Sequence, residues 1–206
     1  MLMKMSHHVT DIREIRDILI SAIALAFVFS YSGWSQIDNI LSVFPYAVLA
    51  VSVGFVLHEL AHRYFARKYE CRAEYKMWKQ GLLLAVAITL LTDGRFVFAA
   101  PGAVMIYPRV DLWGNVKELS SRRFGIISIA GPLTNLALAG AFFAASLFWP
   151  SQILLMGMQI NIWLGLFNMI PFPPLDGSKV FSWSKMIWIA FFAVFAVLFL
   201  FTSGIM

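Results

Sequence analysis

The chain has 206 residues, of which 60% are hydrophobic and 13% charged, and it carries a formal net charge of +5. A soluble domain is about half apolar and about a quarter charged, so the composition argues against a soluble protein built of buried helices. The single cysteine, Cys71, excludes an internal disulfide and is expected to be a reduced cytosolic thiol.

Four stretches without any charged side chain predict the membrane-spanning part of the chain: residues 18–37, 39–57, 124–175 and 186–206. A helix needs about 20 apolar residues to cross the hydrocarbon core of a bilayer. The third stretch is long enough for two such helices, with residues 149–152 as the turn between them. The sequence therefore predicts five full spans and a multi-pass protein of the cell membrane, surrounded by the lipid bilayer.

Residues 81–108, between the second and third spans, consist of two short apolar arms around the polar turn Asp93-Gly94-Arg95. Neither arm is long enough to cross a bilayer, and both start and finish near basic loops. We therefore expect a membrane-re-entrant, β-hairpin-like segment, in which residues 96–98 are β-prone. Two thin spans are the alternative. The expected fold is an all-α polytopic membrane protein with five to six transmembrane helices and this short re-entrant segment.

Basic residues collect in three loops, and these loops set the expected orientation. They follow the second span, precede the third and precede the last, whereas the other two loops contain a single charged residue, Asp38. Because Lys and Arg gather in cytosolic loops, we expect the N-terminus and every basic loop to be cytosolic. This topology accounts for the net charge of +5, and the scattered basic residues do not indicate nucleic-acid binding.

The sequence His58-Glu59-Leu60-Ala61-His62 begins directly after the second charge-free stretch. Residues four apart on a helix lie on one face, about 5–6 Å from each other, so His58 and His62 are placed to supply two nitrogens to a tetrahedral zinc site. Glu59 lies about 100° around the helix, where it suits a general base rather than a ligand. The simpler alternative is a polar helix end at the membrane interface, where ionisable side chains cost little.

A catalytic zinc ion needs a third protein ligand and one open position. Asp176 is the best candidate, because it follows a helix-ending Pro171 and precedes a turn-permitting Gly177 on the predicted side of His58 and His62. Asp93 is the rival candidate, but it lies in the turn of the 81–108 segment, which is predicted to point away from that side.

Three motifs together resemble the site-2 protease family of intramembrane zinc metalloproteases. They are HELAH at 58–62, GPLTN at 131–135 and NMIPFPPLDG at 168–177, and the family carries corresponding motifs in this order. They lie within a catalytic core of about residues 43–179 of what we expect to be one domain, residues 1–206. The chain departs from the family at Ser178, where a second glycine is frequent.

The resemblance implies one Zn²⁺ per chain, bound by His58, His62 and Asp176, with Glu59 as the general base. It also implies that Asn168 and Asn135 help to hold the substrate near the metal. For Asn135, a buried amide that makes one interhelical hydrogen bond is an equally good interpretation.

The resemblance also predicts the activity. Members of the site-2 protease family hydrolyse peptide bonds within or near transmembrane segments of membrane-protein substrates, as in regulated intramembrane proteolysis. The β-strand of their re-entrant region pairs with an unfolded part of the substrate. A ZIP-like divalent metal transporter is the alternative, since it also carries H-E-x-x-H in a membrane helix, but it would be expected to have a second ligand-rich helix. A third interpretation, a protein that binds metal without cleaving, is disfavoured by the intact Glu59.

Overall fold

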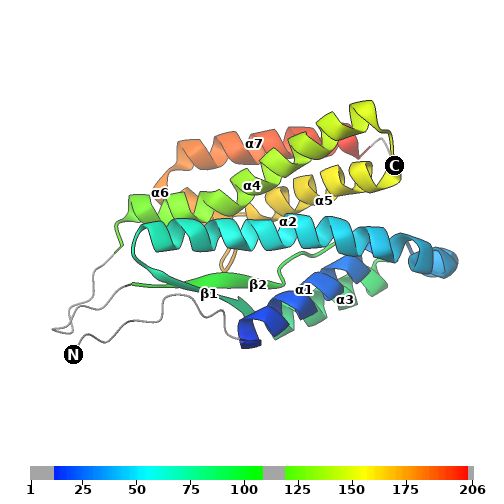
Figure 1. Cartoon of the computed structure of the whole chain (residues 1–206), viewed down its shortest axis with the longest axis horizontal. Coiled ribbons are helices and arrows are strands. Elements are labelled where there is room, and N and C mark those ends of the chain that lie inside the picture. The colour runs from blue at the N-terminus through cyan, green and yellow to red at the C-terminus, as the bar shows by residue number, and fades with distance from the viewer. Residues whose placement is uncertain (1–11, 109–118, 204–206) are drawn as a thin grey trace.

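The computed structural model describes residues 12–108 and 119–203, and these residues are mostly helical. Four helices, α2, α4, α5 and α7, run side by side, while a two-stranded sheet and helices α1 and α3 lie on the other side of α2 (Figure 1). The elements in chain order are α1 (Ile12–Ser30), the 3-10 helix η1 (Trp34–Asn39), α2 (Ile40–Lys68), β1 (Arg72–Met77), α3 (Lys79–Leu91), β2 (Gly102–Tyr107), α4 (Ser121–Phe148), α5 (Gln152–Asn168), α6 (Asp176–Trp183) and α7 (Lys185–Thr202).

Among the described residues, three helical segments are long and apolar enough to cross a membrane: Trp34–Lys68, Ser121–Phe148 and Lys185–Thr202. The other two predicted spans correspond to α1, which has four charged residues in its first two turns, and to α5, which has only 17 residues. The mostly helical membrane fold is thus confirmed, whereas a total of five or six spans stays a prediction. The first predicted span ends at Ser30, because the chain turns at Gly33, whose φ is 107°.

The segment 81–108 differs from the expected hairpin. Its first arm is the helix α3, and its second arm has no regular secondary structure before it forms β2, which begins at Gly102 rather than within residues 96–98. The partner strand is β1, which precedes the segment and pairs antiparallel with β2 from Arg72↔Tyr107 to Met77↔Gly102. Residues that are not branched at Cβ, such as the leucines and alanines of the first arm, favour a helix, and this preference explains the difference.

Strand β1 falls in the stretch that we expected to be a basic loop. Its sequence, Arg-Ala-Glu-Tyr-Lys-Met, alternates charged and apolar residues, and Ala73 and Tyr75 are buried while Arg72 and Lys76 are exposed. This period of two is the mark of a strand with one covered face. The covered face packs against α1 and α2, so the sheet lies beside the helix that carries the H-E-x-x-H motif.

Helix α6 is short, and its start places Asp176. Helix α5 ends at Asn168, the chain makes tight turns through residues 169–175, and Asp176 is the first residue of α6. Helix α6 packs against α4, and α4 packs against α2. These two contacts return the chain to the histidine-bearing end of α2.

Candidate metal centre

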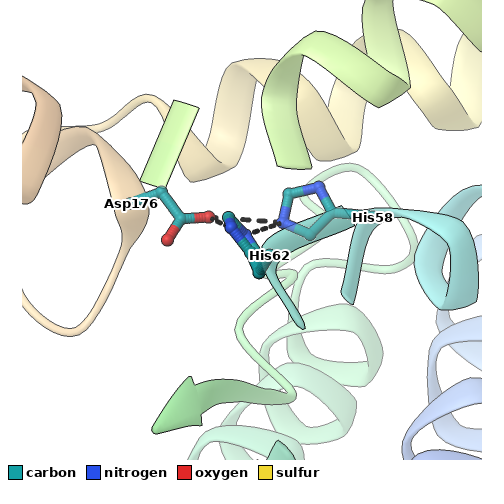
Figure 2. Close-up of side chains that lie close together, drawn as sticks. All are labelled: His58, His62 and Asp176. Carbon is teal, nitrogen blue, oxygen red and sulfur yellow. Dashed lines mark hydrogen bonds and ion pairs between the residues drawn. The ribbon is translucent and has the colours of Figure 1, made fainter. Parts of the chain in front are cut away.

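The structure brings His58, His62 and Asp176 together, with both histidines on α2 and the aspartate reaching across from α6 (Figure 2). The candidate ligand atoms all lie within 4.8 Å of one another. Asp176 Oδ2 is 2.8 Å from His62 Nε2 and 3.3 Å from His58 Nε2, and the two Nε2 atoms are 3.0 Å apart. All three side chains are buried, with exposed fractions of 3% to 7%.

The other ring nitrogens are occupied, and this determines which tautomer each histidine adopts. His58 Nδ1 contacts the side-chain oxygen of Asn135, and His62 Nδ1 lies 2.7 Å from the carbonyl oxygen of Ile127. An oxygen of this kind only accepts, so each Nδ1 carries the proton and each Nε2 is left with a lone pair. Two lone pairs 3.0 Å apart beside a carboxylate repel one another unless a cation lies between them. The donor set of two neutral imidazoles and one carboxylate fits Zn²⁺ with one position open.

Asn135 is held by a chain of amide contacts that runs away from the metal centre. Its Nδ2 donates to Asn161 Oδ1 at 2.9 Å and to the Gly54 carbonyl oxygen at 3.3 Å. Asn161 Nδ2 in turn donates to the Gly157 carbonyl oxygen at 2.8 Å. These contacts orient the Asn135 oxygen toward His58. The network joins α2, α4 and α5, and Asn161, which sequence reasoning missed, was visible only as an amide inside a charge-free span.

Gly131 explains how α4 comes so close to the histidines. A Cβ atom added at this position would overlap the imidazoles of both His58 and His62. The candidate metal-binding rings themselves fill the space that a side chain at Gly131 would need.

Glu59 lies beside the candidate ligands His62 and Asp176, and its carboxylate lines the same pocket. It is 7% exposed, and its Oε2 is buried with no hydrogen-bond partner among the described residues. It lines a small pocket with His62, Asp176, Asn168 and residues 102–104 of β2. The pocket volume is about 10 Å³, close to the minimum that one water molecule needs.

The remaining candidate residues are placed in three different ways. Asn168 faces the pocket and donates through Nδ2 to the Leu164 carbonyl oxygen at 2.9 Å. Asn135 is fully buried behind His58, in the interhelical hydrogen bonding that was the alternative to substrate contact. The rival ligand Asp93 is exposed and outside the cluster, where it accepts the Trp34 N–H at 2.8 Å.

Lys179 is a further residue at the centre that sequence reasoning did not single out. Its Nζ lies 3.3 Å from Asp176 Oδ1, while Asp176 Oδ2 faces the histidines. The signal was available, because a lysine three residues after an aspartate on a helix lies on the same face. The ammonium group leaves Asp176 with one oxygen directed to the metal site.

Comparison with known proteins identifies the family. The chain matches the profile of Peptidase family M50 over residues 46–154. It belongs to this family. It is 42% identical over 181 residues to "Putative zinc metalloprotease MJ0611" of Methanocaldococcus jannaschii, covering 85% of this chain and 87% of that protein. It is 32% identical over 161 residues to "Putative zinc metalloprotease YwhC" of Bacillus subtilis, covering 68% and 69%. No solved structure matches the chain.

Membership of family M50 confirms the predicted resemblance and the class of chemistry. The M50 chain is a metallopeptidase of a membrane-protein family, and Zn²⁺ is its cofactor, in agreement with the cluster of His58, His62 and Asp176. The transporter alternative is not favoured by these relatives.

Proposed function

We propose that this M50 chain is an intramembrane zinc metalloprotease of the site-2 type, which hydrolyses peptide bonds within or near transmembrane segments of membrane-protein substrates, as in regulated intramembrane proteolysis. One observation carries the proposal: the buried Oε2 of Glu59, which has no hydrogen-bond partner among the described residues, lies beside three buried groups that can bind a metal near the end of an apolar helix. A buried carboxylate without a partner is costly, so a catalytic task is the best account of it.

The residues of the centre divide the chemistry among them. When bound by His58, His62 and Asp176, zinc supplies a Lewis acid that polarises the scissile carbonyl and lowers the pKa of a water molecule. Glu59 Oε2 accepts a proton from the attacking water and passes it to the departing amine. Asn168, which lines the same small pocket, is positioned to hold the substrate backbone.

Strand β2 offers the pocket an edge that pairs with no other strand of the described residues and can receive an extended substrate. Tyr75 N–H points away from β2, because it donates to Glu14 Oε1 at 3.0 Å, so the facing pair Tyr75–Val104 is not hydrogen-bonded within the sheet. In such a pair the N–H and C=O of Val104 also point outward. Residues 102–104 line the pocket that contains Glu59, so an unwound substrate segment can add there as a further strand.

The proposed orientation places the centre near the cytosolic surface. Arg63, Arg67 and Lys68 follow the histidines in the last turns of α2, and basic residues gather on the cytosolic side of membranes. We therefore propose that the N-terminus and the opening of the active site are cytosolic, and that the partners of the chain are a transmembrane protein substrate and the lipid bilayer.

The test is cleavage of a single-pass membrane substrate by the purified chain in detergent, compared with the Glu59→Gln variant. Since general-base catalysis is worth about 10²–10⁴-fold, we expect the variant to cleave that much more slowly while it retains its zinc. The swap keeps the size of the side chain, so zinc content and thermal unfolding serve as controls. Equal cleavage by both proteins, or no cleavage by the zinc-loaded wild type, would contradict the proposal.

A further inference from the structure

A third buried carboxylate, Glu14 on α1, lies outside the metal centre and has no part in the chemistry described above. It is 4% exposed, and its Oε1 accepts the Tyr75 N–H at 3.0 Å and pairs with Arg63 Nη1 at 3.1 Å. Arg63 is the residue directly after the metal ligand His62. One carboxylate oxygen therefore joins α1, the catalytic helix α2 and strand β1.

Tyr75 is held by α1 at both of its polar ends. Its hydroxyl donates to Ser21 Oγ at 2.9 Å, and Ser21 lies two helical turns after Glu14 on the same face of α1. The Tyr75 side chain is 2% exposed, and its ring packs edge-on against Phe55 of α2, with 5.5 Å between ring centroids. These contacts fix the strand along its length as well as its distance from α2.

The same strand pair forms one wall of the catalytic pocket. A Cβ atom added at Gly102 of β2 would overlap the Tyr75 hydroxyl, so Tyr75 lies directly behind a residue that lines the pocket. A shift of β1 relative to α2 therefore moves the free edge of β2 relative to Glu59. A slip of β2 by one residue against β1 would also turn the backbone groups of β2 that now face outward toward β1.

Glu14 also makes the two edges of the sheet unequal. The N–H of Tyr75 lies in the middle of the outer edge of β1, and the Glu14 carboxylate occupies it. Residues 102–104 of β2 line the catalytic pocket instead. An exposed strand edge is a template for pairing with another chain, so covering β1 leaves β2 as the productive edge.

We propose that Glu14 is a positioning residue for the peptidase reaction: it fixes β1 against α1 and α2 so that the free edge of β2 presents an extended substrate to Glu59 in one register, and it closes the opposite edge of the sheet. This inference rests on the proposed function, because it concerns how the substrate of that site is aligned.

The experiment compares Glu14→Ala and Glu14→Gln with wild type, each as full-length, zinc-loaded protein in detergent with one single-pass substrate. Glutamine keeps an acceptor for the Tyr75 N–H, whereas alanine removes it. Hydrogen bonds to charged groups contribute enough for about a tenfold effect, so we expect Glu14→Ala to raise KM about tenfold with kcat nearly unchanged. Mass spectrometry should find that its cuts spread over neighbouring peptide bonds, and that Glu14→Gln restores the single cut.

The matched control is Glu74→Gln on the same strand. The Glu74 side chain is 25% exposed, and its nearest charged partner, Arg72, is 3.8 Å away. This variant should keep the KM and the cut position of the wild type. Ser21→Ala removes only the hydroxyl contact of Tyr75 and gives a second, milder variant if Glu14→Ala loses its zinc or unfolds; it should broaden the cut pattern without changing zinc content.

Several results would overturn the inference. A single, unchanged cut position in Glu14→Ala and Ser21→Ala, with full zinc content, would show that Glu14 does not set the register. A fall in kcat with unchanged KM in Glu14→Ala would mean that Glu14 acts in the hydrolysis step rather than in substrate alignment. If the wild type cleaves nothing, the proposed function fails, while hydrogen exchange still tests the positioning: amides 72–77 should exchange at least about tenfold faster in Glu14→Ala than in wild type, and equal exchange would refute it.

Discussion

The two ends of the helix bundle each contain an aspartate, and the two aspartates differ in burial and in contacts. At one end Asp176, followed by a glycine, is buried between two histidines and a lysine. At the other end Asp93, also followed by a glycine, is exposed beside an open cavity of about 440 Å³ between the ends of α1, α5 and α7. The local sequences are similar, and the surroundings decide the outcome.

The difference teaches what makes a carboxylate a metal ligand in this fold. Asp176 lies beside the Nε2 atoms of two histidines and the ammonium group of Lys179. Each imidazole ring is itself held by a contact at its Nδ1, such as that of His62 Nδ1 with the Ile127 carbonyl oxygen. Asp93 meets a backbone N–H and a wide cavity lined largely by apolar side chains.

The contrast between the two aspartates is tested most directly by Asp176→Asn. The change removes the carboxylate ligand but keeps its size, and even the loss of a residue that only supports a ligand costs about 10–100-fold in metal affinity. We expect zinc affinity to fall by more than this, with loss of peptidase activity, as measured by metal analysis after dialysis against a chelator. Asp93→Asn should retain its zinc; zinc loss in this control would mean that Asp93 supports the site.

The close approach of α4 to the metal centre is tested by Gly131→Ala. The added methyl group would overlap both imidazoles, and overpacking of this kind costs about 1–3 kcal/mol. We expect lower zinc affinity and a lower unfolding temperature in detergent. Gly140→Ala is the matched control on the same helix, because a Cβ there meets nothing within 4 Å. A normal metal centre in Gly131→Ala would show that α4 can withdraw from α2 at little cost.

The two asparagines at the centre should separate into different roles. Asn135→Ala removes the acceptor that orients His58, so we expect zinc affinity to fall about 10–100-fold. Asn168→Ala should leave zinc affinity unchanged and impair cleavage, because this residue lines the pocket without contacting a ligand nitrogen. Zinc competition assays and steady-state kinetics measure the two effects. Identical zinc affinities for both variants would remove the distinction.

The opposite end of the bundle should tolerate change with a small, purely structural effect. Trp163→Phe removes the indole N–H that donates to the Val97 carbonyl oxygen at 3.2 Å, so we expect a loss of about 0.5–1.5 kcal/mol in unfolding free energy. Zinc content should not change. Trp149→Phe is the control, since Trp149 is 73% exposed, and it should be nearly neutral in the same thermal unfolding assay. Loss of zinc in Trp163→Phe would couple the two ends.

Local geometry made part of the centre readable in advance. His58, Glu59 and His62 follow from spacing alone, because a helix places residues four apart on one face wherever it lies. Strand β1 was equally readable from its alternating Arg-Ala-Glu-Tyr-Lys-Met sequence, and it was missed because its charges were counted toward a cytosolic loop. Tyr75 shows why the alternation matters, since it faces the core between two charged neighbours.

Other features depend on contacts between segments far apart in the chain. The sequence was sufficient for the helical membrane class, the zinc motif and the family, since these follow from hydropathy and short motifs. The predicted topology also favoured Asp176 over Asp93. The contact of Asp176 with both histidines, the contact of Asn135 with His58 and the burial of Glu14 required the packing of the helices. Short-range spacing sets which side chains share a face, whereas the partner across a helix interface depends on how two surfaces fit together, and no local pattern encodes that fit.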